Sequence, residues 1–190
     1  MARPQGVSGM IDAAKYDKIE TLKNGTAVRI RSVRAGDKDR ISEAFRNLEP
    51  ESIYTRFFRH KKDLTDKELK AATEVDFENV VALVVTVGEA GNETIIAGGR
   101  YAAFGAANNR RSAEVSFTVE EDYHGQGIAS RLLRHLAQIA REKGVSQFEA
   151  EVLSGNKAML TVFSRSGLPI KKSFEGGTTH VTLSLEETVT

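Results

Sequence analysis

The residues from 124 to 130 lie where the sequence changes its period. Val115, Phe117 and Val119 alternate with polar residues, the pattern of a strand with one buried face. From Ile128 onward apolar residues recur every three or four positions, the stripe of an amphipathic helix. The stretch His-Gly-Gln-Gly lies between the two patterns. The sequence therefore predicts a strand, a glycine-containing turn and the start of a helix, in that order.

A helix that begins directly after a strand could bind phosphate. Its first N–H groups have no partner within the helix, and the helix dipole makes this end positive. Gly125 and Gly127 would let a phosphate approach the backbone closely; the alternative is that they only make a tight turn. A dinucleotide-binding Rossmann turn fits less well, because Ser130 occupies the place of its third glycine and no helices separate the preceding strand patterns.

The elements that must position this turn follow from the rest of the chain. The pattern predicts an α+β fold with a twisted, mostly antiparallel mixed sheet flanked by helices. Residues 1–24 lack a sustained period, so we expect a flexible or loosely docked N-terminal extension. We expect a single domain over residues 25–187 and a tail over 188–190. Strand patterns cover 26–33, 79–87, 93–104, 112–119, 144–153 and a hairpin at 170–185, and helical patterns lie around 41–48, 49–58, 65–69, 128–140 and 156–167.

Composition excludes several classes of function. The 190 residues contain 27 Lys and Arg against 26 Asp and Glu, which does not indicate a nucleic-acid partner. No window reaches the roughly 20 apolar residues of a membrane span, and the N-terminus has no apolar run typical of a secretory signal. There is no cysteine, and His60, His135 and His180 have no paired spacing, so we expect no metal site. These features predict a cytoplasmic protein without a membrane partner and leave its oligomeric state open.

Two separated motifs resemble the GCN5-related N-acetyltransferase (GNAT) superfamily, over about residues 26–185. The family signature is Arg or Gln, two residues, Gly, one residue, then Gly or Ala. Here its places fall on His124, Gly127 and Ala129, so the first place departs from the family, which weakens the role of that side chain but not of its backbone. A second segment of the family, Asn followed by a helix with an aromatic residue and then Gly and an apolar residue, resembles Asn156, Phe163, Gly167 and Leu168.

A narrower resemblance is carried by LEPESIYTRFF and by SAEVSFTVEEDYHGQGIASRLL. These stretches are similar to the acetyltransferase domain of bacterial protein lysine acetyltransferases of the Pat type. The resemblance implies acetyl-CoA as the donor and a primary amine as the acceptor, with a protein lysine as the leading candidate.

Glu114 matches the position of the catalytic glutamate in the Pat-type domains. A lysine ammonium, with a pKa of about 10.4, must lose a proton before its nitrogen attacks a thioester, and a carboxylate can accept that proton. The resemblance therefore implies Glu114 as the general base. The alternative is an ordinary solvent-facing carboxylate in a salt bridge.

The resemblance also implies which residues bind the cofactor. Phe163 stands where many relatives have a tyrosine that protonates the leaving thiolate; it would be a wall of the CoA site or simply helix core. Asn156 could bind the pantetheine arm or cap the helix that begins after it. Backbone N–H groups near Phe117 and Val119 could stabilise the oxyanion. The full predicted set is Phe117, Thr118, Val119, His124, Gly125, Gln126, Gly127, Ile128, Ala129, Ser130, Asn156 and Phe163.

Two other classes of protein share this CoA site. A small-amine or antibiotic N-acetyltransferase would differ in the acceptor pocket, which the sequence does not resolve. A non-catalytic acyl-CoA-binding module would lack the general base, and Glu114 argues against it.

Overall fold

The computed structural model describes residues 9–105 and 111–186, and within them a single sheet of eight strands runs in the order β1-β2-β3-β4-β5-β6-β8-β7. Neighbouring strands pair antiparallel except for β5 and β6, which are parallel. The α+β fold with a mostly antiparallel sheet is thus as predicted. The strands are β1 (Asp17–Thr21), β2 (Ala27–Ser32), β3 (Val80–Val87), β4 (Thr94–Phe104), β5 (Arg111–Val119), β6 (Val145–Leu153), β7 (Ile170–Glu175) and β8 (Thr178–Ser184).

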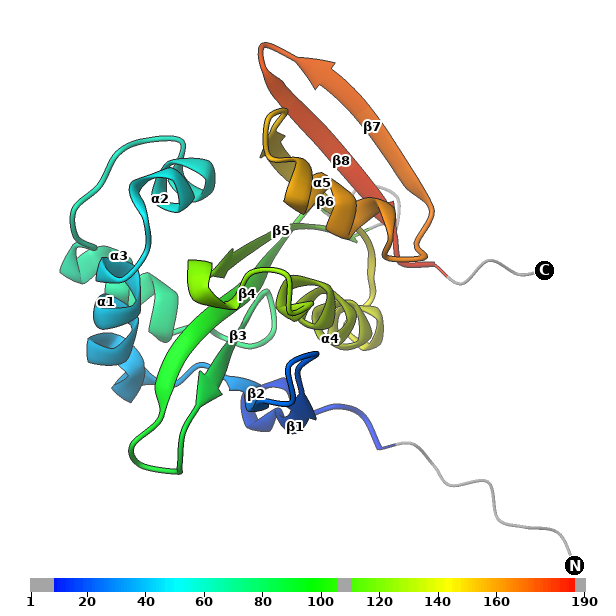
Figure 1. The fold of residues 1–190 in the computed structure, drawn as a ribbon. Coiled ribbons are helices and arrows are strands. Elements are labelled where there is room, and N and C mark those ends of the chain that lie inside the picture. The colour runs from blue at the N-terminus through cyan, green and yellow to red at the C-terminus, as the bar shows by residue number, and fades with distance from the viewer. Residues whose placement is uncertain (1–8, 106–110, 187–190) are drawn as a thin grey trace, which may run out of the picture.

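Helices cover both faces of the sheet (Figure 1). On one face α4 packs over the central strands, and its buried Leu132, Leu136 and Ile139 belong to the main hydrophobic core. On the other face α1 packs over a smaller cluster that includes Val33 and Ile95. The helices are α1 (Lys38–Arg46), α2 (Pro50–Phe57), α3 (Asp66–Thr73), α4 (Ile128–Glu142) and α5 (Lys157–Ser164), with short 3-10 turns at Ala13–Lys15, Ala35–Asp37 and Glu121–Tyr123.

The parallel strands β5 and β6 separate partway along their length. Their pairing runs from Arg111 opposite Val145 to Glu114 opposite Glu149 and ends there, although β5 continues to Val119. The N–H of Glu120 donates to Ile96 of β4, so the alternating residues Val115, Phe117 and Val119 direct their N–H groups toward the β6 side. Beyond Glu114 these N–H groups therefore face the gap between the two strands.

The prediction of an N-terminal extension without regular structure is wrong for β1. Strand β1 pairs with β2 along its whole length, from Asp17 opposite Arg31 to Thr21 opposite Ala27. Tyr16 and Leu22 on either side of it are 6% and 3% exposed and anchor it to the core. The strand itself is an exposed edge, so it has no buried face to give a two-residue hydrophobic period. Residues 1–8 of the predicted extension, and residues 187–190 with the predicted tail, lie outside the described residues.

Gly99 on β4 makes room for an aromatic side chain of the neighbouring strand. A Cβ at this position would lie 2.8 Å from Cδ1 of Phe117 and 3.3 Å from a methyl carbon of Leu136. Because Gly99 has no side chain, the Phe117 ring can occupy this space between the sheet and α4.

Candidate active site

A cleft of about 940 Å³ opens where β5 and β6 separate. It is bounded by α2, the far half of β5, the loop before α4, the end of β6 and the start of α5. Glu114 lines it, as do most of the residues predicted to bind the cofactor: Phe117, Thr118, Val119, His124, Gly125, Gly127, Ile128, Ala129, Ser130, Asn156 and Phe163. Gln126 does not line the cleft.

The loop before α4 has the geometry of an anion-binding helix start. Gly125 and Gly127 have φ angles of 76° and 81°, a left-handed conformation that favours glycine. Gly127 is the N-cap of α4, and no side chain caps the helix there. The first backbone bond of the helix joins the N–H of Arg131 to the carbonyl of Gly127 at 3.1 Å. The N–H groups of residues 128–130 are therefore available to a phosphate at this end of the helix dipole.

The side chains of His124 and Gln126 hold the loop in place. Nε2–H of His124 donates to the carbonyl oxygen of Val119 at 2.8 Å, which ties the loop to the end of β5. Oε1 of Gln126 accepts from the N–H of Asn24 at 3.1 Å, which ties the loop to the turn between β1 and β2. Through these bonds both side chains position the loop, and the backbone of both residues forms part of the turn before α4.

Glu114 points to the face of the sheet opposite α4 and is exposed. Ala113 and Val115, its neighbours along β5, are buried in the core beneath α4. Within residues 9–105 and 111–186, Glu114 has no hydrogen bond or ion pair. The salt bridge that was the alternative role for this carboxylate is therefore not present among these residues. The charge of Glu114 acts on two nearby guanidinium groups, those of Arg56 and Arg100. Burial lowers the pKa of both groups, and Glu114 opposes this change.

Besides Glu114, four carboxylates line the cleft, together with the cations Lys23, Arg56, Lys157 and Arg165. Glu49 and Glu51 come from the start of α2, Glu121 from the turn after β5 and Glu151 from β6. The N–H of Glu49 donates to Oε1 of Glu121 at 3.1 Å, which joins α2 to the cleft wall. Carboxylates near a reacting group favour a positively charged acceptor such as an ammonium group.

The two residues taken from the second motif have structural roles in addition to lining the cleft. Asn156 is the N-cap of α5, and its Oδ1 accepts from the N–H of Met159 at 3.1 Å. Phe163 is 1% exposed, and its ring centroid lies 6.1 Å from that of Phe117. The Phe117–Phe163 pair thus forms a hydrophobic floor between α5 and β5, consistent with the helix-core interpretation of Phe163.

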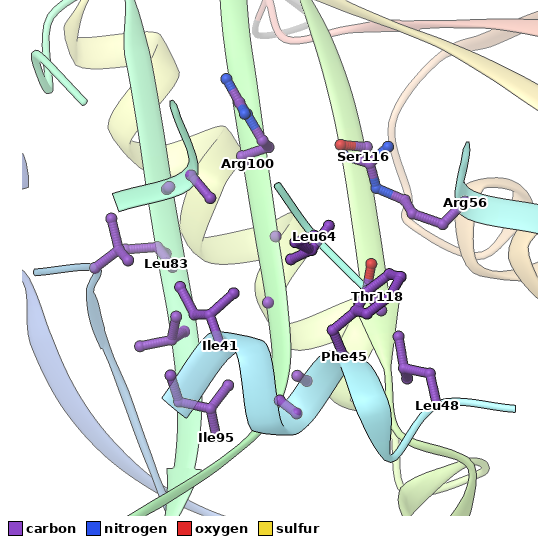
Figure 2. A pocket seen from close by; sticks show the side chains of 18 of the residues that line it. Ile41, Phe45, Leu48, Arg56, Leu64, Leu83, Ile95, Arg100, Ser116 and Thr118 are labelled. Atoms are coloured by element: carbon purple, nitrogen blue, oxygen red, sulfur yellow. The ribbon is translucent and has the colours of Figure 1, made fainter. Parts of the chain in front are cut away.

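A smaller cavity of about 290 Å³ adjoins the cleft on the face of the sheet that carries α1 (Figure 2). Apolar side chains of α1, α3, β3 and β4 form most of its wall, including Ile41 and Phe45. Arg56, Ser116 and Thr118 line both this cavity and the cleft, so the two spaces meet along β5. The sequence did not indicate this cavity, because its wall comes from segments far apart in the chain.

Lys23 and Arg56 line the cleft but were not predicted as site residues. Lys23 falls in the segment that the sequence suggested was a loose extension. Arg56 belongs to the LEPESIYTRFF stretch, which did signal a resemblance but gave no reason to single out this residue. Only the packing of α2 and of the β1–β2 turn brings them to the cleft.

The described residues contain no group of three or more His, Cys, Asp or Glu side chains placed to hold a metal ion. Within the same residues, no helix is long and apolar enough to cross a membrane.

Comparison with known proteins assigns the chain to a family. The acetyltransferase (GNAT) family model matches residues 43–168. An acetyltransferase of Pseudomonas aeruginosa is 30% identical over 141 residues, which cover 74% of this chain and 74% of that protein. The acetyltransferase Pat of Mycolicibacterium smegmatis is 35% identical over 146 residues, which cover 77% of this chain and 42% of that protein. The crystal structure of the GNAT domain of S. lividans PAT is 34% identical, with a TM-score of 0.80, and the match covers 88% of this chain and 96% of that one.

The chain belongs to the GNAT family of acetyltransferases. It is an N-acetyltransferase that takes its acetyl group from acetyl-CoA, and the predictions of family, fold and donor are confirmed. The chain spans less than half the length of the mycobacterial Pat.

Proposed function

We propose that this N-acetyltransferase acetylates the side-chain amine of protein lysines and that Glu114 is its general base. One observation carries the proposal: an exposed carboxylate, without a bonding partner in the described structure, lines the cleft at the point where β5 and β6 separate. A carboxylate tied up in an ion pair would be a poorer proton acceptor.

The proposed mechanism assigns three roles to residues of this chain. The start of α4 and the loop from His124 to Gly127 would hold the phosphates of acetyl-CoA. The N–H groups of Phe117 and Val119 face the gap between the strands and would donate to the thioester oxygen as it gains charge. Glu114 would remove a proton from the acceptor ammonium, directly or through a water molecule, so that the neutral amine can attack the thioester carbon.

The leaving group requires no acid from the position of Phe163, which has no proton to give. A thiol with a pKa near that of cysteine, about 8.5, can leave as a thiolate. The buried Phe117–Phe163 pair would instead exclude water from one side of the reacting groups.

Protein lysine is favoured as the acceptor for two reasons. Glu49, Glu51 and Glu121 line the cleft together with Glu114, and carboxylates attract a cationic acceptor. The sequence match to Pat and the structural match to the GNAT domain of S. lividans PAT extend over most of this chain.

A small amine that carries a carboxylate is the second candidate acceptor. Within the described ranges no carboxylate bonds to the guanidinium of Arg56 or Arg100, and both side chains border the apolar cavity beside Glu114. An amino acid with an apolar body would suit this combination of cations and cavity.

The experiment compares the two acceptor classes under one set of conditions. The protein is incubated with acetyl-CoA and a bacterial lysate, scored by acetyl-lysine mass spectrometry, and in parallel with a panel of amino acids and small amines, scored by release of CoA thiol. Acetylation of defined protein lysines, with kcat/KM well above that of any small amine, supports the proposal. Turnover of a small amine without protein acetylation would contradict it and favour the second candidate.

A further inference from the structure

The turn between β1 and β2 lies against the loop that precedes α4 (Figure 1). Asn24 of the turn bonds to Gln126 of the loop. Cε of Lys23 lies 3.7 Å from the position that a Cβ on Gly127 would occupy. Lys23 also lines the cleft. A cationic side chain from the N-terminal segment thus reaches the start of α4.

The turn that presents Lys23 is held by its own hydrogen bonds. The N–H of Leu22 donates to the carbonyl of Thr26 at 2.8 Å, and the N–H of Gly25 donates to the carbonyl of Leu22 at 3.0 Å. Oδ1 of Asn24 accepts from the N–H of Thr26 at 3.0 Å. Leu22 is 3% exposed and fixes the turn to the core. The position of Lys23 is therefore set by the fold, although its side chain is exposed.

Arg131, in the first turns of α4, is already engaged. Its Nε lies 2.9 Å from Oε2 of Glu20, and its Nη2 donates to the carbonyl of Thr21 at 2.7 Å. Only its Nη1 faces Gly127, at 3.5 Å from the position of a Cβ there. These two contacts hold Nε and Nη2 of Arg131 against β1, although Glu20 also pairs with Arg134 at 2.6 Å. The ammonium of Lys23, in contrast, has neither a hydrogen bond nor an ion pair within residues 9–105 and 111–186.

We propose that Lys23 binds the pyrophosphate of CoA and completes the site formed by the start of α4. A helix start supplies backbone N–H groups and a partial positive charge, but it does not neutralise a pyrophosphate. A free ammonium beside Gly127 supplies a full charge and three donors. Strand β1 would thus serve cofactor binding twice, by presenting Lys23 and by holding Arg131 through Glu20 and Thr21. This inference concerns the donor site and does not depend on which acceptor the enzyme uses.

The test measures binding by calorimetry, without turnover. Lys23→Gln should weaken binding of CoA by about five- to tenfold, the change typical of one charge-assisted hydrogen bond at a partly exposed site. Binding of 3′-dephospho-CoA should weaken by the same factor, because it keeps the pyrophosphate. Lys23→Arg should bind both ligands nearly as well as the wild type. Lys18→Gln on β1, which removes an equal charge outside the cleft, is the matched control and should leave both affinities unchanged. Added salt should weaken CoA binding less in Lys23→Gln than in the wild type.

Three outcomes would overturn the proposal, each in a different way. Unchanged CoA affinity in a folded Lys23→Gln protein would show that the ammonium does not touch the cofactor. A loss seen with CoA but absent with 3′-dephospho-CoA would move the contact to the 3′-phosphate. An equal loss of CoA affinity in Lys18→Gln would show that the effect comes from the net charge of the protein and not from a contact of Lys23. Pantetheine, which lacks phosphate, should bind wild type and Lys23→Gln alike, and a loss there would point to a general disturbance of the cleft.

Discussion

Replacement of Glu114 by Gln tests the proposed chemistry most directly. The change keeps the size of the side chain and removes its ability to accept a proton. Because Glu114 makes no hydrogen bond or ion pair in the described structure, the change removes only its longer-range attraction to Arg56 and Arg100. We therefore expect the melting temperature to move by no more than about 2 °C and the affinity for CoA to stay the same.

The expected size of the effect follows from the acceptor. At pH 7.4 a lysine with a pKa of about 10.4 is neutral in roughly one molecule in a thousand. Without a base the variant depends on that neutral fraction, so kcat should fall by about 10²–10⁴-fold, the range typical of general bases. Each unit of pH raises the neutral fraction about tenfold. The variant should therefore recover about tenfold per unit between pH 7 and 9, while the wild type changes less.

The assay is kcat and KM across this pH range, with CoA affinity measured in parallel. Glu51→Gln is the matched control, since it removes a carboxylate that also lines the cleft. It should alter KM for a cationic acceptor more than kcat, and its pH profile should follow the wild type. Wild-type turnover of Glu114→Gln at neutral pH would refute the general-base role. An equal loss of kcat in Glu51→Gln would show that the effect comes from the overall charge of the cleft and not from proton transfer to Glu114.

Three further variants test the site and the elements that position it. Gly127→Glu places a carboxylate at the helix start, so the CoA affinity measured by calorimetry should fall sharply. The control Gly176→Glu, in the β7–β8 turn and also at positive φ, should leave that affinity unchanged. Unaltered CoA affinity in a folded Gly127→Glu protein would contradict the phosphate site. Gly99→Ala brings a Cβ to 2.8 Å from the Phe117 ring, so denaturant unfolding should show a loss of about 1–3 kcal/mol, and a neutral result would mean that the ring can move aside. Burial lowers the pKa of His135 from its ordinary value of 6.5. Just below pH 6.5 the unfolded chain therefore binds a proton at this residue that the folded chain does not. The contribution of His135 to the stability of the folded protein is consequently lost as the pH falls below about 6.5. His135→Gln should flatten that part of the curve of melting temperature against pH, and an identical slope would contradict this role.

The pH effect of His135 depends on a contact between distant segments. Its Nδ1 accepts from the hydroxyl of Tyr16 at 2.5 Å, and its Nε2–H donates to Oε1 of Glu20 at 2.7 Å. These bonds tie the N-terminal segment to α4, the helix whose start forms the phosphate site. The sequence suggested only a scattered histidine, because nothing in its local pattern indicates a partner more than 100 residues away.

The sequence alone determined the parts of this protein that rest on local signals. The strand at 112–119, the glycine turn and the helix from residue 128 follow one another in the chain, so period and turn chemistry are enough to define them. The same holds for the cap at Asn156, which the structure contains as a bond within a single turn. The two separated motifs then identified the family and its donor.

Tertiary structure alone decided which distant residues share the cleft. Strand β1 has no buried face, so its place at the sheet edge is visible only through its pairing with β2 and through the buried Tyr16 and Leu22. Lys23 and Arg56 reach the cleft because the β1–β2 turn and α2 pack against it. The gap between β5 and β6 is equally invisible in the sequence, since both strands keep their hydrophobic alternation beyond the point where they separate. A local pattern specifies which face of an element is buried, but which element covers that face depends on contacts across the whole chain.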